Sequence, residues 1–278
     1  MDTIASGLEL TLLPGARVLL QAHARELPQR DDLCGAFCGS LALNAAGLCE
    51  RGGEPLDQDA VAVLAGSFVS RVPDTSALPA GERGRRDYRI TPPMLDDASV
   101  SGTNCAGVLR AVHELSGERL CALPYAGPWS GAALAALFDA LAALEHPSTL
   151  IANVATRHLW GSAPSVPQLL GLLLDGTDEG PPPDWDVGHF VCVFGRIAGR
   201  GGDLYGVADT YPALGVHGVH VQPRDRLARA LERPGMAPGG AIAVIDREDA
   251  AVVRAAADAC GLQERAWDNG TQMAEPGA

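Results

Sequence analysis

The apolar pattern of the chain changes its period near residue 188, and this change limits the fold more than any other feature of the sequence. Upstream, apolar residues recur at helical spacing in four segments, at 34–48, 57–69, 101–117 and 129–147. Downstream lie four short β-rich runs that Gly, Pro and Asp separate: HFVCVFGRI, DLYGVAD, GVHGVHVQ and GAIAVID. Helices first and strands last predict an α+β fold, in which a helical half packs on a C-terminal antiparallel sheet.

We expect one domain over residues 1–278, built from two parts. Residues 29–175 form the mainly helical part, and residues 176–246 form the mainly antiparallel sheet. Residues 247–278 add a C-terminal helix and a loose tail. The segment 71–98 is rich in Pro, Gly and Arg, so it is predicted to be a long surface loop.

The charge of the chain excludes some classes of partner. Acidic residues outnumber basic ones by 34 to 21, and the formal net charge is −13. Without a basic stripe the chain is not expected to bind nucleic acid or an anionic membrane. The longest apolar run, AALAALFDALAAL, contains Asp139 and is too short to span a bilayer. No basic region precedes the apolar N-terminal stretch, so we expect a cytoplasmic protein whose seven cysteines stay reduced.

The stretch QRDDLCGAFCG, residues 29–39, places a thiol where a thiolate is favoured. Cys34 stands at the predicted start of a helix, where free N–H groups and the helix dipole stabilise an anion. Asp31 and Asp32 are candidate caps of this helix, and Gly35 would let a substrate approach the backbone. Gln29, five residues before the thiol, is placed to donate its amide to a developing oxyanion. A small buried cysteine is the structural alternative to a nucleophile.

A thiol nucleophile needs a base, and the base needs a group that orients it. His189 begins the first β-rich run, and Asp209 ends the second. An antiparallel hairpin through the GRGG turn brings the start of one strand beside the end of the other. The hairpin therefore predicts that His189 and Asp209 are neighbours. Together with Cys34 they form a candidate acyl-transfer triad, although a structural histidine and a turn aspartate are the simpler interpretations of each residue alone.

These motifs resemble those of a known group. A glutamine before CG on an apolar helix, a distant GHFVCVFG and then DTYP on the next strand are similar to the papain-like fold, in its peptidase C39-like branch. The resemblance covers most of residues 29–246. Three features depart from it: Gln29 is one residue closer to the cysteine than is usual, and the insert at 71–98 and the loop at 176–186 are not typical of a small peptidase.

Within that fold the chain is most similar in kind to the off-loading Dieckmann cyclases of tetramate and pyridone biosynthesis. That resemblance implies a role in making polyketide or nonribosomal peptide antibiotics. Cys34 would take the chain from a thioester on an acyl or peptidyl carrier protein. His189 would remove a proton from a carbon between two carbonyls, Asp209 would orient the imidazole, and no cofactor would be needed. The Ala- and Leu-rich segments 130–144 and 166–174 would either line an acyl pocket or form core helices.

Other functions stay open: a C39-like cysteine peptidase, a thioesterase or acyltransferase, and an inactive papain-fold binding module. The oligomeric state is not predicted. In the cyclase group the acid lies between the cysteine and the histidine, which would here be Asp57 or Asp59. A helix over 34–48 carries the chain about 20 Å away from the thiol, so we favour Asp209 and interpret both others as helix caps.

The remaining cysteines and histidines predict no second site. Cys38 lies inside the same helix and Cys105 has no partner pattern, so both are interpreted as packing residues. His217 and His220 are three apart, which on a strand puts the two imidazoles on opposite faces. Neither CxxC nor HExxH occurs, so no metal site is predicted.

Overall fold

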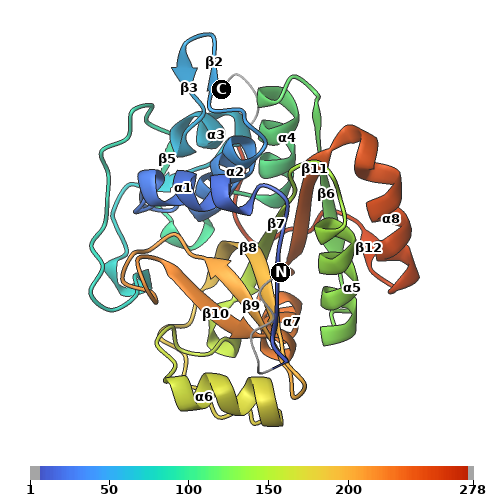
Figure 1. Ribbon diagram of the computed structural model, residues 1–278. Coiled ribbons are helices and arrows are strands. Elements are labelled where there is room, and N and C mark those ends of the chain that lie inside the picture. The colour runs from blue at the N-terminus through green and yellow to red at the C-terminus, as the bar shows by residue number, and fades with distance from the viewer. Residues whose placement is uncertain (1–6, 275–278) are drawn as a thin grey trace.

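The computed structural model describes residues 7–274, in which helices cover both faces of one eight-stranded sheet (Figure 1). Every pairing within this sheet is antiparallel, so the α+β class is confirmed. The strands lie in the order β10 (Val219–Pro223), β9 (Asp203–Ala208), β8 (Gly188–Ala198), β7 (Thr149–Ala155), β11 (Gly240–Asp246), β6 (Leu120–Ala126) and β12 (Gln263–Glu264), and β1 (Glu9–Leu12) also pairs with β8.

Four helices cover one face of the sheet, and the candidate nucleophile, Cys34, is the first residue of one of them. They are α1 (Ala16–Glu26), α2 (Cys34–Ala45), α3 (Gln58–Ala65) and α4 (Cys105–Leu115). Helix α2 is buried almost all round, because α1, α3 and α4 surround it and the sheet lies beneath it. Strand side chains alternate between the faces, so Ile151 of β7 packs in this layer while Leu150 and Ala152 pack in the opposite one.

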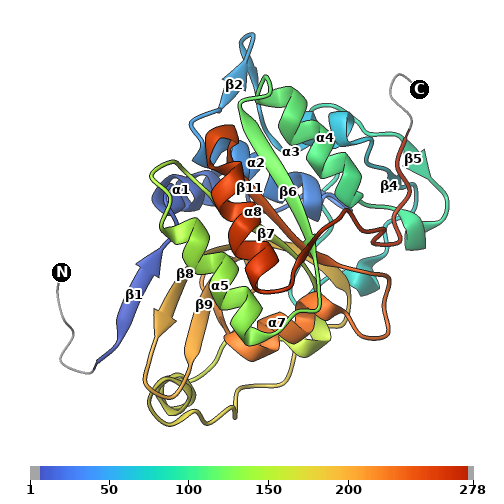
Figure 2. The same ribbon diagram turned by 90° about the vertical axis from the view of Figure 1, so that its right-hand side faces the viewer.

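The opposite face is covered by α5 (Gly131–Ala142), α7 (Arg224–Glu232) and α8 (Ala250–Ala259), which stand in front of the strands in Figure 2. The core between them and the sheet includes Leu134, Phe138 and Leu231. The arrangement is thus three layers rather than a helical half beside a sheet half. Strands β6 and β7 come from residues 29–175 and join the same sheet as the later strands.

Strand β6 is not among the predicted strands, and it contains Pro124. The carbonyl oxygen of Pro124 accepts a hydrogen bond from the backbone of Arg265, on the side away from β11. The backbone nitrogen and the carbonyl of one strand residue point to the same neighbouring strand. The nitrogen of Pro124, which has no hydrogen, therefore also points away from β11. Proline therefore removes no bond between β6 and β11.

The segment 71–98 is mostly irregular, as predicted, but it is held firmly. It contains the 3₁₀ turn η1 (Thr75–Ala77) and β5 (Met94–Leu95), which pairs in parallel with β4 (Val69–Ser70). The remaining short elements are the hairpin β2 (Glu50–Arg51) and β3 (Glu54–Pro55), the turns η2 (Ala98–Val100), η3 (Thr156–His158) and η5 (Arg247–Asp249), and α6 (Val166–Leu170), which continues into one π turn, η4 (Gly171–Asp175).

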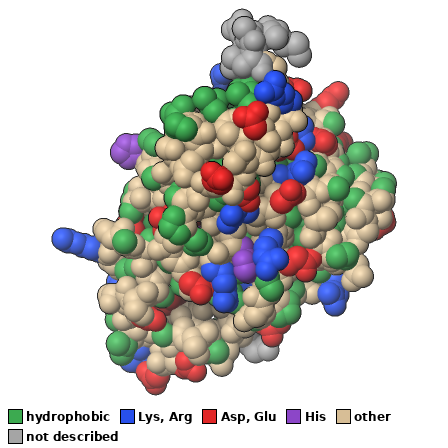
Figure 3. All heavy atoms as spheres, turned by 90° about the horizontal axis from the view of Figure 1, so that it is seen from below, with side chains coloured by type: hydrophobic (Ala, Val, Ile, Leu, Met, Phe, Trp, Pro, Cys, Tyr) green, Lys and Arg blue, Asp and Glu red, His purple; other side chains and the backbone are tan. Residues whose placement is uncertain are grey.

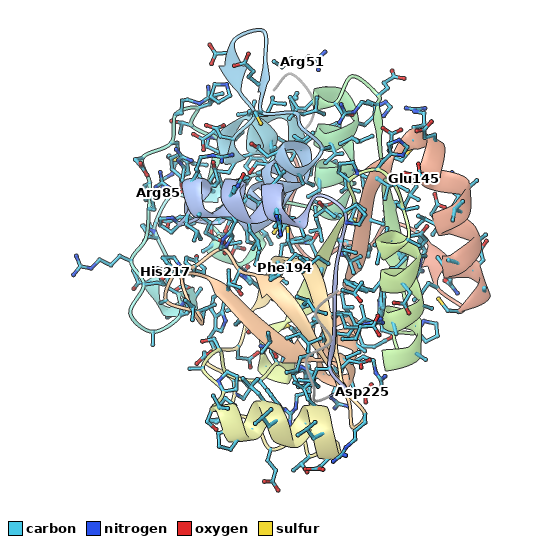
Figure 4. The ribbon with its side chains drawn as sticks, in the orientation of Figure 1. Arg51, Arg85, Glu145, Phe194, His217 and Asp225 are labelled. Atoms are coloured by element: carbon cyan, nitrogen blue, oxygen red, sulfur yellow. The ribbon has the colours of Figure 1, made fainter. Side chains whose placement is uncertain are left out.

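Aspartates hold this segment by its backbone. Asp31 Oδ1 accepts from the N–H of Arg85, and Asp32 Oδ2 accepts from the N–H of Ser70 at the end of β4, each at 2.7 Å. The guanidinium of Arg85, beside α1 in Figure 4, donates to the carbonyl of Pro28. The prediction that Asp31 and Asp32 cap α2 is therefore wrong, because their carboxylates are engaged with the 71–98 region.

The tail after α8 is not loose over the part that is described. Gln272 donates its N–H to the carbonyl of Val100, and Ala274 donates to the carbonyl of Gly66. These bonds fasten the tail to the loops around α3 and α4. Between residues 7 and 274 we find no helix with both the length and the apolar character needed to cross a membrane.

Candidate active site

The candidate nucleophile stands at the first residue of α2. Cys34 is partly exposed and lines a cleft of about 350 Å³. Leu33 is the N-cap residue, and no side chain caps the first turn of the helix. The N–H groups of that turn therefore remain available beside the thiol, where they favour negative charge.

Gly35 has a different role from the one predicted. A Cβ atom at this position would lie 2.9 Å from Cβ of Thr103 and 3.2 Å from Cδ2 of Phe190. The missing side chain thus allows α2 to pack closely against the loop before α4 and against β8. The space is occupied by the protein itself and is not left for a substrate.

His189 and Asp209 are neighbours, as the hairpin geometry predicts. Strands β8 and β9 pair with Cys192 opposite Ala208, and this register brings the start of β8 beside the end of β9. His189 Nε2 donates to Asp209 Oδ1 over 3.0 Å, and both side chains are buried. The other ring nitrogen, Nδ1, has no hydrogen-bond partner within the described residues, and the Cys34 thiol is close enough to raise the pKa of the ring.

The electrostatics of the three residues are coupled. Burial lowers the pKa of His189, but the Asp209 carboxylate and then the Cys34 thiol act in the opposite direction and raise it to about 10. Burial would raise the pKa of Asp209, yet His189 and His220 hold it well below its usual range. Both shifts favour the pair of a carboxylate and an imidazolium, which is the state that stabilises a neighbouring thiolate.

A second histidine binds the other oxygen of the same carboxylate, and sequence reasoning missed it. His220 Nε2 donates to Asp209 Oδ2 at 3.2 Å, and its Nδ1 accepts from the amide nitrogen of Gln222. The amide cannot be reversed, because its oxygen accepts from the N–H of Trp160 and its nitrogen donates to the carbonyl of Trp160. His220 is therefore held as the neutral Nε2–H tautomer.

The hairpin argument that paired His189 with Asp209 would also have found His220. Strand β10 pairs with β9 so that Val219 is opposite Ala208, which brings His220 beside the end of β9. His217 lies outside the strand, in an exposed turn with a φ of 51° (Figure 4), so the prediction of two imidazoles on opposite faces of one strand is wrong. A third histidine, His23 of α1, donates to the backbone carbonyl of Asp209.

Two aromatic rings shield the imidazole of His189 from solvent. Trp185 meets it edge-on with ring centres 4.9 Å apart, and Tyr211 stacks on it at 6.0 Å. Only 2% of His189 is exposed. Such shielding strengthens the interaction of the ring with Asp209, because little water competes with it.

Gln29, the predicted oxyanion donor, shares the cleft with Cys34. It is buried, and its side-chain oxygen accepts from the hydroxyl of Thr210. That bond fixes the amide orientation and leaves the amide nitrogen as a free donor. The backbone of Gln29 also donates to the carbonyl of Thr210, so the residue after Asp209 positions this amide from two sides.

The rival acids belong to other parts of the structure. Asp57 caps α3 by accepting from the N–H of Ala60, as predicted. Asp59 is not a cap: its buried carboxylate accepts from the N–H groups of Arg89 and Ile90 and lies 3.4 Å from Arg30 Nε. It therefore anchors the 71–98 segment and has no contact with His189.

The rival thiols are core residues. Cys38 and Cys105 are both fully buried. Burial raises the pKa of Cys38 well above its usual value, and it raises that of Cys105 to about 12. Neither thiol is suited to act as a nucleophile near neutral pH.

The cleft is enclosed by segments that the sequence did not connect with the site. The 71–98 segment contributes Pro73 and Leu78, and the C-terminal tail contributes Asn269 and Thr271. The segments 130–144 and 166–174 do not line the cleft, so of the two interpretations the core helices are confirmed and the acyl pocket is wrong. They pack elsewhere, in the core beneath α5 and around α6.

No metal centre accompanies these residues. Within residues 7–274, no three His, Cys, Asp or Glu side chains gather in a way that would hold a metal ion.

Acidic and basic side chains are interspersed over the face seen from below in Figure 3.

Comparison with known proteins gives one match. Residues 13–268 match a family of unknown function, DUF6885, and this range includes all four predicted site residues. No curated protein matches the chain.

Proposed function

The chain belongs to the DUF6885 family, and we propose that it is an enzyme that forms an acyl-thioester on Cys34. The observation that carries this proposal is the buried imidazole of His189. It is charged by Asp209 on one side and faces the Cys34 thiol, which raises its pKa, on the other. A purely structural histidine would not need a thiol at the mouth of a cleft.

The proposed first half-reaction transfers an acyl group to the protein. The Cys34 thiolate attacks the carbonyl carbon of a carrier-bound thioester, and the oxyanion accepts hydrogen bonds from Gln29 and from the first turn of α2. The carbon–sulfur bond to the carrier then breaks, and the carrier thiol leaves with the proton from His189. This step leaves His189 neutral and ready to act as a base.

The proposed second half-reaction closes a ring. His189 removes a proton from the carbon between the two carbonyls of a β-ketoacyl-aminoacyl chain. The resulting carbanion attacks the thioester carbonyl on Cys34, a carbon–carbon bond forms, and the thiolate leaves while His189 holds the proton. We propose a Dieckmann cyclase with an acyl or peptidyl carrier protein as partner. The aromatic shield of His189 and the 71–98 residues that line the cleft support it, since a cyclase has to limit water near the thioester.

The test begins with the thiol. At neutral pH, iodoacetamide should label Cys34 faster than Cys49, which is exposed but lies outside the cleft. Cys34→Ala should abolish turnover, and Cys49→Ala should leave it unchanged. Equal labelling of the two thiols would argue against a nucleophile at Cys34.

The product then separates the functions. Incubation with a synthetic β-ketoacyl-aminoacyl thioester should give a product with the mass of the substrate minus the thiol, because intramolecular attack is favoured in a dry site. A product heavier by one water would identify a thioesterase. Cleavage of an ordinary peptide at a comparable rate would identify a peptidase, and either result would remove the cyclase proposal.

A further inference from the structure

We propose that Arg233 and Asn153 form a subsite in the cleft that binds a carboxylate of the substrate. Both residues line the cleft together with Cys34. Asn153 lies in β7, and Arg233 is the residue that ends α7. The inference deepens the proposed function, since it rests on Cys34 as the nucleophile and names a chemical group of the acyl donor.

Arg233 is a buried cation without an acidic partner. Only 5% of the residue is exposed, and within residues 7–274 no carboxylate lies within ion-pair distance of it. Its hydrogen bonds go to neutral oxygens, from Nη1 to Asn153 Oδ1 and to the carbonyl of Pro238. Nε is buried and has no partner. A buried charge is strongly unfavourable unless an anion or several hydrogen bonds compensate it. The guanidinium of Arg233 has no such anion within the described part of the chain, so a bound anion would stabilise it.

The surrounding backbone is built to hold this side chain. A Cβ at Gly188 would lie 2.3 Å from Arg233 Nη2, and a Cβ at Gly239 would lie 2.2 Å from Arg233 Cδ. Arg233 itself has a φ of 49°, a left-handed conformation that is uncommon for a residue other than glycine. Gly188 and Gly239 leave room for the side chain, and the uncommon backbone conformation of Arg233 directs its guanidinium to the cleft. A guanidinium on the protein surface would need neither feature.

The chemistry of the subsite selects an anion. The oxygen of Asn153 accepts from Arg233, so the amide nitrogen is the group that remains for a ligand. An arginine and an amide nitrogen present only N–H donors, and a carboxylate with two oxygens accepts from both. Burial lowers the pKa of Arg233, and the Cys34 thiol partly opposes this effect, which indicates that the cation and the nucleophile are close.

A structural role explains only part of this arrangement. The bonds from Nη1 tie β7 to the connection between α7 and β11. A neutral glutamine would serve that purpose without burying a charge. The position of the guanidinium on the cleft, with an Nη2 group for which no partner is found among the described residues, is left unexplained by a structural role, and a bound carboxylate accounts for it.

Alkylation of Cys34 by a charged and a neutral reagent of the same size tests the proposal. Iodoacetate and iodoacetamide each form a carbon–sulfur bond with the release of iodide, and they differ in the carboxylate. The rate constant of iodoacetate at Cys34, divided by that of iodoacetamide, is measured by peptide mass spectrometry. This ratio should fall by about tenfold in Arg233→Gln, which corresponds to the loss of one charge-assisted hydrogen bond. Arg157→Gln is the matched control, since Arg157 pairs with Asp186 and does not line the cleft; its ratio should match that of the wild type.

A second variant covers the case in which Arg233→Gln does not fold. Asn153→Asp keeps the arginine and supplies the missing carboxylate, so it should also lower the ratio while preserving or raising the melting temperature. An unchanged ratio in the folded variants would overturn the subsite. A wild-type Cys34 that neither reagent labels would instead overturn the proposed function. Acetate should slow labelling by iodoacetate more than inorganic phosphate does, and the reverse order would overturn the choice of a carboxylate.

Discussion

Asp209 receives hydrogen bonds from three histidines, two on its carboxylate and one on its backbone carbonyl. The two imidazoles on the carboxylate differ in protonation. His220 is fixed in its neutral form by Gln222, whereas His189 has no such acceptor bond and is free to carry the second proton. The charge of the network therefore resides on the imidazole beside Cys34, and His220 serves to hold the carboxylate in position.

Asp209→Asn should leave a folded protein whose kcat is lower by about four orders of magnitude, because an amide does not hold the imidazole in the required tautomer. Steady-state turnover of an acyl-thioester measures this effect. Asp59→Asn is the comparison. It should retain the wild-type catalytic mechanism but lower the free energy of unfolding by about 3 kcal/mol, because Arg30 loses its fully buried partner and keeps only the partly buried Glu26, 3.8 Å away. The opposite pattern would transfer the orienting role to Asp59.

The ion pair between His189 and Asp209 predicts how the stability of the protein depends on pH. The raised pKa of His189, about 10, contributes stability that is complete below the unfolded value and is lost as pH rises toward 10. The lowered pKa of Asp209 contributes stability that is present above its unfolded value and is lost as pH falls. Urea unfolding should therefore show the largest advantage of wild type over Asp209→Asn between about pH 4 and 6.5, and a smaller one toward pH 10. An advantage that grows with pH would contradict the ion pair.

At the scale of elements, α2 owes its position to close packing at its first turn. Gly35→Ala should lower the free energy of unfolding by about 1–3 kcal/mol, since the new Cβ would meet Thr103 Cβ at 2.9 Å. To relieve this contact the first turn of α2 would have to move, and Cys34 would move with it. The rate of alkylation of the Cys34 thiol should therefore fall. Gly171→Ala is the matched control. Its Cβ would meet nothing closer than 3.7 Å, and a helical alanine there should be neutral or stabilising by up to about 1 kcal/mol.

Local patterns were sufficient to predict the elements that carry the site. The helix start at Cys34 and the hairpin that joins His189 to Asp209 depend on nearby residues, so the sequence contains the information. Asp31, Asp32 and Asp59 were interpreted as helix caps because capping is the local use of an aspartate. Their actual partners are the backbone of the 71–98 segment and the residue before it, and no local pattern reports such contacts.

At the scale of the whole molecule, the cleft is assembled from segments that are far apart in the chain. The tail after α8 crosses from the α5 and α8 side of the sheet to the region of β4 and β5 (Figure 2). There Asn269 accepts from the N–H of Cys105 and donates to the carbonyl of Thr103. A tail with no periodic pattern was expected to be loose, because its order comes only from these distant partners.

Removal of residues 269–278 tests whether the tail is a wall of the site. Trp267 stays in the core, so the sheet should remain folded. The lost hydrogen bonds are largely offset by the regained chain entropy, and the free energy of unfolding should fall by no more than about 2 kcal/mol. Asn269 and Thr271 would no longer line the cleft, so a bulky maleimide should react with Cys34 faster relative to iodoacetamide.

Asn269→Ala provides the finer comparison, because it removes the two bonds to the start of α4 but leaves the rest of the tail. It should change the ratio of maleimide to iodoacetamide reactivity less than the truncation does. The truncated protein should also release more hydrolysed product and less ring from a β-ketoacyl-aminoacyl thioester, since an opened cleft admits water. Unchanged reagent and product ratios in a folded truncated protein would show that the tail lies beside the site without enclosing it.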